Sequence, residues 1–170
     1  MLAGDDEAFR TVYRALQPPL LRYLTVLVGV ADAEDMASEA WSQAFRDLDR
    51  FSGGADGFRG WVTTIGRNRA LDHLRRNSRR PVSDQPVEDL VDLPDSVDVE
   101  LDTLGRVNSE AILALIAALP REQAEAIMLR TVLGFDAPTS ARILGKRPGA
   151  VRAAAHRGLK QLAKKLADEP

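Results

Sequence analysis

One stretch divides this chain and limits what it can fold into. Residues 81–105, PVSDQPVEDLVDLPDSVDVELDTLG, contain eight acidic residues and three prolines but no lysine or arginine. Proline disrupts the interior of helices and sheets, and closely spaced like charges repel and extend a chain. We therefore expect an acidic, flexible linker at 81–105. The rest of the chain must then fold as two small domains, residues 1–80 and 106–170.

The first domain has helical periodicity, with one ambiguous segment. The first helix has one apolar face, made of Phe9, Val12, Tyr13 and Leu16. Pro18-Pro19 follows, and we expect these two prolines to interrupt the helix. The next segment, LLRYLTVLVG, has enough β-branched residues to resemble a strand. Its neighbours are all helical, so we predict a helix there.

Two further helices complete the first domain. The segment ADAEDMASEAWSQAFRDLDRF predicts a helix capped by Asp32, with an inward face of Met36, Ala37, Ala40, Trp41, Ala44, Phe45 and Leu48. SGGADG (52–57) reads as a loop. A long helix over 58–80 follows, with apolar residues at helical spacing (Phe58, Trp61, Val62 and Ile65). The second domain repeats this helical periodicity, so the fold class is all-α.

A break near the end of the chain predicts a helix-turn-helix. Asp136 can cap a short helix, Gly145 suits the left-handed residue that ends it, and Pro148 suits the first position of the next helix. The second helix has one apolar stripe, made of Val151, Ala155, Leu159, Leu162 and Leu166. Its opposite side is cationic.

Charge is segregated along the chain, although the net charge is only −2. Residues 137–167 contain eight lysines and arginines and no acid. The helix over 58–80 contains seven arginines and the single acid Asp72. A solvated face normally mixes both signs, so these basic faces indicate nucleic-acid binding.

The aromatic residues of the long helix allow two interpretations. Phe58 and Trp61 can be core residues, because aromatic side chains are readily buried. They also follow a glycine-rich loop and precede Asn68 and several arginines, which is the combination that unstacked bases require. On that reading, one domain holds a duplex while the other opens it.

Several classes of function are excluded. The chain has no cysteine, so disulfides and cysteine-bound metals are absent. The acids of DAEDMASE lack a histidine partner and are expected at a helix start, and FSGGADGF lacks the Lys-Ser/Thr of a phosphate-binding loop. We expect no catalytic site, metal or cofactor. No apolar run suits a signal peptide or a membrane span, so we expect a cytoplasmic protein without membrane insertion of its own.

Taken in order, these segments resemble bacterial sigma factors of the extracytoplasmic-function (ECF) group, within the sigma-70 family, over essentially the whole chain. ADAEDMASEAWSQAFRDLDRF is similar to region 2.1–2.2, FRGWVTTIGRNRALDHLRR to regions 2.3 and 2.4, and LPREQAEAIMLRTVLGF with ARILGKRPGAVRAAAHRGLKQL to region 4. The resemblance implies binding to core RNA polymerase at the β′ clamp helices and the β flap. It also implies melting and reading of the −10 promoter element, reading of the −35 element, and control by an anti-sigma factor.

The resemblance assigns residues to three surfaces. The core polymerase surface comprises Asp35, Glu39, Gln43 and Arg46. The −10 surface comprises Ser52, Gly53, Phe58, Trp61, Arg67, Asn68, Arg69, Arg75 and Arg76. The −35 surface comprises Arg147, Gly149, Arg152, Ala153, His156, Arg157, Lys160 and Lys164.

Some residues depart from the family pattern. Ala153, Ala154 and Leu159 replace polar or basic residues of region 4, and Ser140 stands where an apolar core residue is usual. These changes imply a different −35 sequence, or more reliance on phosphate contacts and DNA shape. The chain begins inside the family's first helix pattern, so we expect the natural start to lie upstream. Two alternatives remain: a stand-alone helix-turn-helix regulator and, less well matched, an enzyme acting on nucleic acid.

Overall fold

The computed structural model describes residues 6–79 and 101–168, and every regular element in these ranges is helical. The first half contains α1 (Asp6–Val28), α2 (Val30–Arg46), the short helix η1 (Leu48–Arg50) and α3 (Ala55–Arg79). The second contains α4 (Leu101–Ala117), α5 (Arg121–Ile127), the π-helical turn η3 (Met128–Val132), α6 (Ala137–Leu144) and α7 (Pro148–Asp168). The all-α prediction is confirmed.

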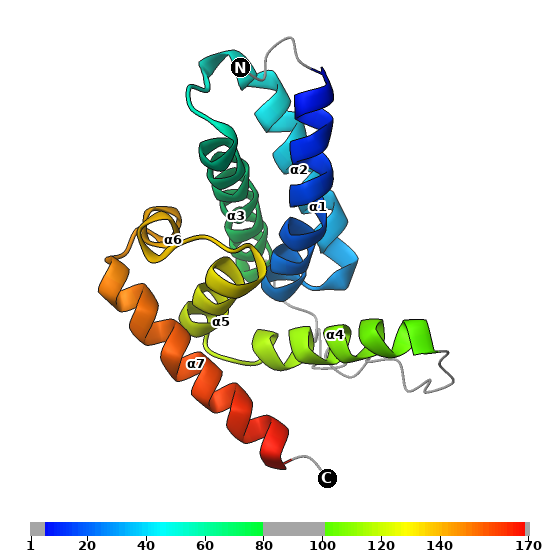
Figure 1. The fold of residues 1–170 in the computed structure, drawn as a ribbon, viewed down its shortest axis with the longest axis vertical. Helices are drawn as coiled ribbons and strands as arrows, with labels where there is room; N and C mark the ends of the chain where they lie inside the picture. Colours follow the sequence, from blue (N-terminus) through cyan, green and yellow to red (C-terminus); the bar gives the residue numbers. More distant parts are fainter. Residues whose placement is uncertain (1–5, 80–100, 169–170) are drawn as a thin grey trace.

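The first half is a bundle of three long helices that lie side by side (Figure 1). Its core includes Leu16, Leu20 and Leu24 of α1, all fully buried against α2 and α3. Gly66 of α3 faces this core, where a Cβ would make ordinary van der Waals contact with Leu20 Cδ1 at 3.4 Å. The segment LLRYLTVLVG is helical, as predicted.

The predicted interruption at Pro18-Pro19 is wrong, because α1 runs through both prolines. A proline inside a helix removes one backbone hydrogen bond. The carbonyls that lose these bonds belong to Arg14 and Ala15, which are exposed, so water can reach them. Buried leucines on both sides of the prolines hold the helix against the core.

Two other boundaries differ from the sequence prediction. Helix α3 begins at Ala55, so SGGADG is only half loop; Asp56 in the first turn favours this early start. The predicted linker 81–105 lies mainly outside the described residues, but 101–105 form the start of α4. The apolar spacing from Leu101 to Leu104 suits a helix.

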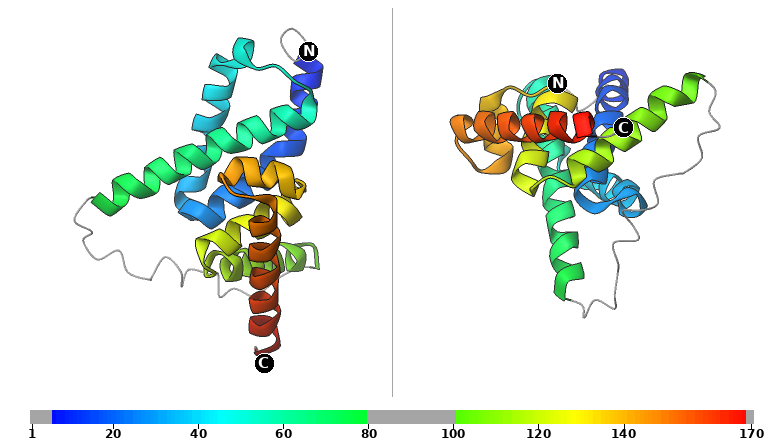
Figure 2. Two further views of the ribbon diagram at one scale, coloured as in Figure 1. Left: turned by 90° about the vertical axis from the view of Figure 1, so that its left-hand side faces the viewer. Right: turned by 90° about the horizontal axis from the view of Figure 1, so that it is seen from below.

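The two halves pack against each other. In Figure 2, α5 and α6 lie against the α1–α3 bundle, and contacts join α5 and η3 to α1 and α6 to α3. The buried apolar side chains form a single cluster that runs from Leu16 to Leu162. The sequence predicted two domains and a tether, but not this contact.

Candidate nucleic-acid and polymerase interfaces

The helix-turn-helix forms as the sequence predicts. The Thr139 N–H donates to Asp136 Oδ1 at 2.8 Å, which caps α6. Hydrogen bonds from the backbone N–H and the hydroxyl of Thr139 lower the pKa of Asp136. Gly145 ends α6 in the left-handed region (φ 66°, ψ 37°), and α7 begins at Pro148. The turn therefore sets the direction of α7.

Helix α7 presents a cationic face to solvent. All eight residues assigned to the −35 surface are exposed: Arg147, Gly149, Arg152, Ala153, His156, Arg157, Lys160 and Lys164. The only acid in α7 is Asp168, its last residue. In the turn before α7, Lys146 pairs with Glu122 at 2.7 Å, an exposed contact that lowers the pKa of Glu122. The helix can therefore lie along a nucleic-acid backbone without an opposing acid on its own face.

The inner face of α7 differs from the predicted stripe. Val151, Ala155 and Leu162 are buried, but Leu159 and Leu166 are 46% and 47% exposed. Ala154 and Gly158 take the inner positions instead. Position 158 is closely packed: a Cβ there would lie 2.7 Å from Ile127 Cδ1, so α5 leaves no room for a side chain at that inner position.

Helix α2 presents an exposed polar stripe. Asp35, Glu39 and Arg46 point to solvent, spaced so that they share one side of the helix. Gln43, assigned to the same surface, is half-buried, and its side-chain oxygen accepts two hydrogen bonds from Arg69 at 2.9 and 2.6 Å. Three of the four assigned residues are therefore fully available.

Two details of α2 correct the sequence prediction. The helix begins at Val30 and not at an Asp32 cap; the Asp32 carboxylate instead meets His73 Nε2 at 3.0 Å. Phe45, predicted to face inward, is 64% exposed and contacts the Phe9 ring edge-on at 5.6 Å. Phe45 directly follows the buried Ala44 in the sequence and lies at the rim of the packed face.

The aromatic residues near the start of α3 form a cluster. Phe58 is fully buried and contacts four other rings (Phe9, Trp41, Phe51 and Trp61). Trp61 is half-buried and stacks on Phe51 with centroids 5.1 Å apart. The core interpretation therefore applies to Phe58, which offers no surface to a base. Trp61 keeps part of its ring accessible.

The remaining residues of the −10 surface are divided between solvent and protein partners. Ser52, Gly53, Asn68, Arg75 and Arg76 are exposed, although Arg75 pairs with Asp72. The side chains of Arg67 and Arg69 already have protein partners. Arg67 is held by a residue of the second half.

A buried polar group joins the two halves, and the sequence analysis did not find it. Glu125 of α5 is 3% exposed. Its Oε1 accepts from the Tyr23 hydroxyl at 2.7 Å and from Arg67 Nε at 2.7 Å, and Oε2 accepts from Arg67 Nη2 at 3.3 Å. We call these three residues the Tyr23–Glu125–Arg67 triad. The isolated acid Glu125 within the apolar run AEAIML was the only signal for it.

Burial and charge shift the pKa values of the triad. Burial raises the pKa of Tyr23 well above its ordinary value, and the adjacent Glu125 charge adds to the rise. Burial alone would lower the pKa of Arg67, but hydrogen bonding to Glu125 and its negative charge outweigh this and raise it. Tyr23 is therefore neutral and Arg67 charged at ordinary pH.

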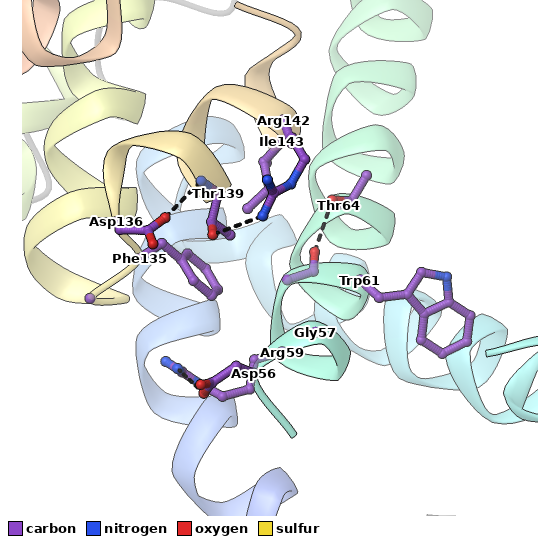
Figure 3. Close-up of a pocket in the computed structure, with 12 residues that line it drawn as sticks. Asp56, Gly57, Arg59, Trp61, Thr64, Phe135, Asp136, Thr139, Arg142 and Ile143 are labelled. Carbon is purple, nitrogen blue, oxygen red and sulfur yellow. Dashed lines mark hydrogen bonds and ion pairs between the residues drawn. The ribbon is translucent and has the colours of Figure 1, made fainter. Parts of the chain in front are cut away.

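A second contact crosses between the halves nearby. Arg59 Nη2 donates to the Leu133 carbonyl at 2.7 Å, and its guanidinium lies 5.1 Å from the centre of the Phe135 ring. A cleft of about 520 Å³ opens beside it, between α3 and α6. Figure 3 shows Asp56, Arg59 and Trp61 on one wall and Asp136, Thr139 and Arg142 on the other.

The described residues contain no group of three or more His, Cys, Asp or Glu that could hold a metal ion. Within the same ranges, no helix has the length and apolar character to cross a membrane.

Comparisons with known proteins match both halves. Residues 12–80 match the model of sigma-70 region 2, and residues 109–162 match that of sigma-70 region 4. The chain is 30% identical to the ECF RNA polymerase sigma factor SigD of Mycobacterium tuberculosis, covering 95% of this chain and 78% of SigD. The chain belongs to the ECF RNA polymerase sigma factor family. The family resemblance predicted from its motifs is thereby confirmed.

Other ECF sigma factors match over similar lengths. The chain is 32% identical to ShbA of Streptomyces griseus, with 94% of this chain and 87% of ShbA covered. It is 30% identical to BldN of Streptomyces coelicolor, covering 98% of this chain but only 63% of BldN. The chain thus spans less than two thirds of BldN.

Solved structures share the fold. RpoE of Bartonella quintana, in a co-crystal with the anti-sigma factor NepR, matches with a TM-score of 0.73 and 22% identity, covering 96% of this chain and 99% of RpoE. CnrH, in complex with the cytosolic domain of CnrY, matches with a TM-score of 0.68 and 22% identity, covering 98% and 93% of the two chains. At this identity, the likeness concerns the fold alone.

Proposed function

We propose that this ECF sigma factor binds core RNA polymerase and directs it to specific promoters, acting as an initiation factor and not as an enzyme. The observation that carries the proposal is the uninterrupted cationic face of α7, presented by the Gly145 turn and exposed along its length. A helix in this position fits the major groove and neutralises phosphates there. We assign −35 reading to this face.

The polymerase-binding surface is assigned to α2. Asp35, Glu39 and Arg46 form an exposed stripe of mixed charge on a helix whose other side is anchored in the core. A rigid helix with charged groups on one side suits contact with another helix, such as the β′ clamp helices. Gln43 contributes only if Arg69 releases it. Contact with the β flap is assigned to the second half of the chain as a whole, with no individual residues named.

Opening of the −10 element is assigned to loop 52–54 and to the length of α3 that follows it. Ser52 and Gly53 are exposed in this loop, and Trp61 supplies a partly accessible ring in the first turns of α3. Asn68, Arg75 and Arg76 are exposed further along α3 towards its C-terminal end. Stacking on an aromatic ring contributes about 1–3 kcal/mol per base. Phe58 supports this surface from beneath.

The test is transcription with sigma-free core polymerase. The protein is added to core enzyme and a library of duplex promoters, and transcripts are sequenced to find which templates support initiation. We expect initiation at a defined class with −35 and −10 elements. Specific duplex binding without polymerase, combined with no initiation, would instead establish a stand-alone helix-turn-helix regulator.

We further propose that an anti-sigma factor holds this protein inactive in the cell interior. The support is the family and the sigma–anti-sigma complex in which RpoE, which shares this fold, was crystallised. A partner that inhibits by clamping both halves should protect residues 33–46 and 149–164 from hydrogen exchange. An inhibitory complex in which neither segment gains protection would contradict this arrangement.

A further inference from the structure

One hydroxyl group lies among the arginines at the C-terminal end of α3. Ser78 is exposed in the last turn of this helix, which ends at Arg79. In both views of Figure 2, this end of α3 projects beyond the other helices. Ser78 Oγ donates to the Arg75 carbonyl at 2.9 Å, a bond in which the hydroxyl oxygen uses none of its own lone pairs. Ser78 therefore offers an accessible nucleophilic oxygen.

The residues around Ser78 are strongly basic. The segment 75–80 reads RRNSRR, so arginines stand three and two positions before the serine. Three other exposed serines have an acid three positions before them instead: Ser38, Ser42 and Ser52 follow Asp35, Glu39 and Asp49. A protein kinase whose peptide-binding groove is acidic attracts the first arrangement and repels the second. Charge complementarity therefore distinguishes Ser78 from these serines.

A phosphate on Ser78 would change the charge of this segment. A phosphoserine carries about −1.5 to −2 charges, so it would neutralise about half of the charge of the four arginines in 75–80. Arg75 lies three positions before Ser78, on the same side of the helix, and its guanidinium pairs with Asp72. Arginine binds phosphate through forked hydrogen bonds, so the phosphate would compete with Asp72 for Arg75. An anion at the C-terminus of a helix is also unfavourable, so the last turn of α3 would loosen.

We propose that Ser78 is a phosphorylation site for an arginine-directed protein kinase, and that the phosphate withdraws Arg75 from promoter DNA. In the transfer, Ser78 Oγ attacks the γ-phosphorus of ATP. The new bond from Oγ to phosphorus replaces the bond from that phosphorus to the β–γ bridging oxygen, ADP leaves, and a base of the kinase takes the hydroxyl proton. The effect on promoters rests on the proposed function, whereas the modification itself does not.

The acceptor role is tested with the purified full chain, ATP and the cyclic-AMP-dependent protein kinase, an arginine-directed enzyme. Mass spectrometry of peptides follows the phosphate that each serine gains. We expect Ser78 to react at least about tenfold faster than Ser109, which is exposed and has a single arginine, Arg106, three positions before it. Ser42, which follows an acid, is the matched negative control. A rate at Ser78 no higher than that at Ser42 would overturn the site.

Modification in the cell is tested separately. The protein is isolated from the bacterium that produces it, with phosphatases inhibited, and its peptides are mapped by mass spectrometry. We expect phosphate on Ser78 in a fraction of the molecules, and its loss after phosphatase treatment. Absence of phosphate from Ser78 at every stage of growth at which the protein accumulates would overturn the assignment.

Transcription tests the consequence for promoters. Phosphorylated and untreated protein are compared with core polymerase on a duplex promoter at several salt concentrations. We expect phosphorylation to lower promoter-complex formation by about tenfold and to reduce its salt dependence by about one charge, while association with core polymerase is unchanged. Ser78→Ala, treated with the same kinase, is the control and should keep full activity. Phosphorylated protein as active as the untreated protein would overturn the regulatory role.

The phosphorylation site and the promoter function fail in distinguishable ways. If the untreated protein initiates at no promoter, the proposed function is wrong. The phosphorylation rates are measured without polymerase or DNA, so they still decide whether Ser78 is an acceptor.

Discussion

At the scale of single residues, Ser140 is a buried polar group without a partner. Its side chain is fully buried in α6, and Oγ makes no hydrogen bond. A buried hydroxyl without a partner costs about 1–3 kcal/mol. We predict that Ser140→Ala raises the free energy of unfolding by about 1 kcal/mol, measured by urea denaturation. Ser42→Ala, at an exposed position, is the control and should change it little. A clear loss of stability in Ser140→Ala would show that the hydroxyl has a structural role.

Residues of α7 divide into two predicted roles. Lys160 is a long exposed cation suited to phosphate, whereas Arg152 and His156 are better placed to reach base edges. Lys160→Ala should weaken binding to all −35 sequences alike and reduce the salt dependence by about one charge. Arg152→Ala or His156→Ala should change which sequences are preferred, by about 1–3 kcal/mol per lost base contact. Transcription from a −35 library at two salt concentrations measures both effects. If Lys160→Ala changes sequence preference while Arg152→Ala and His156→Ala only weaken binding, α7 faces DNA with another side.

At the scale of helices, Gly158 sets how closely α7 approaches α5. A Cβ there would lie 2.7 Å from Ile127 Cδ1 and 3.1 Å from Gln123 Cβ. Alanine favours a helix over glycine by about 1 kcal/mol, but overpacking costs about 1–3 kcal/mol. We predict that Gly158→Ala lowers the melting temperature. Gly149→Ala, in the first turn of the same helix with nothing near its Cβ, should raise or preserve it. Equal effects of the two substitutions would mean that α5 simply moves aside.

The exposed stripe of α2 gives the second element-scale prediction. Replacing Asp35 and Glu39 together with lysine reverses two charges without touching the core. We expect core polymerase association, measured by gel filtration, to be lost while the circular dichroism spectrum and melting temperature change little. Reversal of two exposed acids elsewhere, Glu7 and Asp49, provides a control with the same change in net charge. Undiminished association in the folded variant would place the polymerase contact elsewhere.

At the scale of the whole molecule, Tyr23 links docking to pH. Its pKa is raised by burial and by the Glu125 charge, and Arg67 is the cation that faces the same carboxylate. The folded protein therefore keeps the Tyr23 proton at a pH where the unfolded chain has lost it. The stability of the contact is intact below about pH 10, the ordinary tyrosine value, and falls as pH rises above it. We predict a decline in unfolding free energy above pH 10 that is smaller in Tyr23→Phe. Equal declines in both proteins would exclude Tyr23 as the cause.

Sequence patterns predicted the elements better than their assembly. Helix periodicity, the Asp136 cap and the Gly145 turn are local, so the helix-turn-helix could be predicted from neighbouring residues alone. Pro18-Pro19 misled because buried leucines on both sides outweigh a local preference. Tyr23 and Glu125 lie 102 residues apart, and no local pattern pairs them. Sequence left both interpretations of Phe58 open, because three of the four rings that it contacts, Phe9, Trp41 and Phe51, come from other segments of the chain.

That separation along the chain also has a consequence in time. Contacts among α1, α2 and α3 are comparatively local and can form as soon as α3 has been synthesised. Glu125 is made later, at roughly 5–20 residues per second, so we expect the first half to exist for several seconds without the residue that pairs with Arg67. In each newly made molecule, Arg59 and Arg67 are therefore uncovered for a short time before the helix-turn-helix has been synthesised.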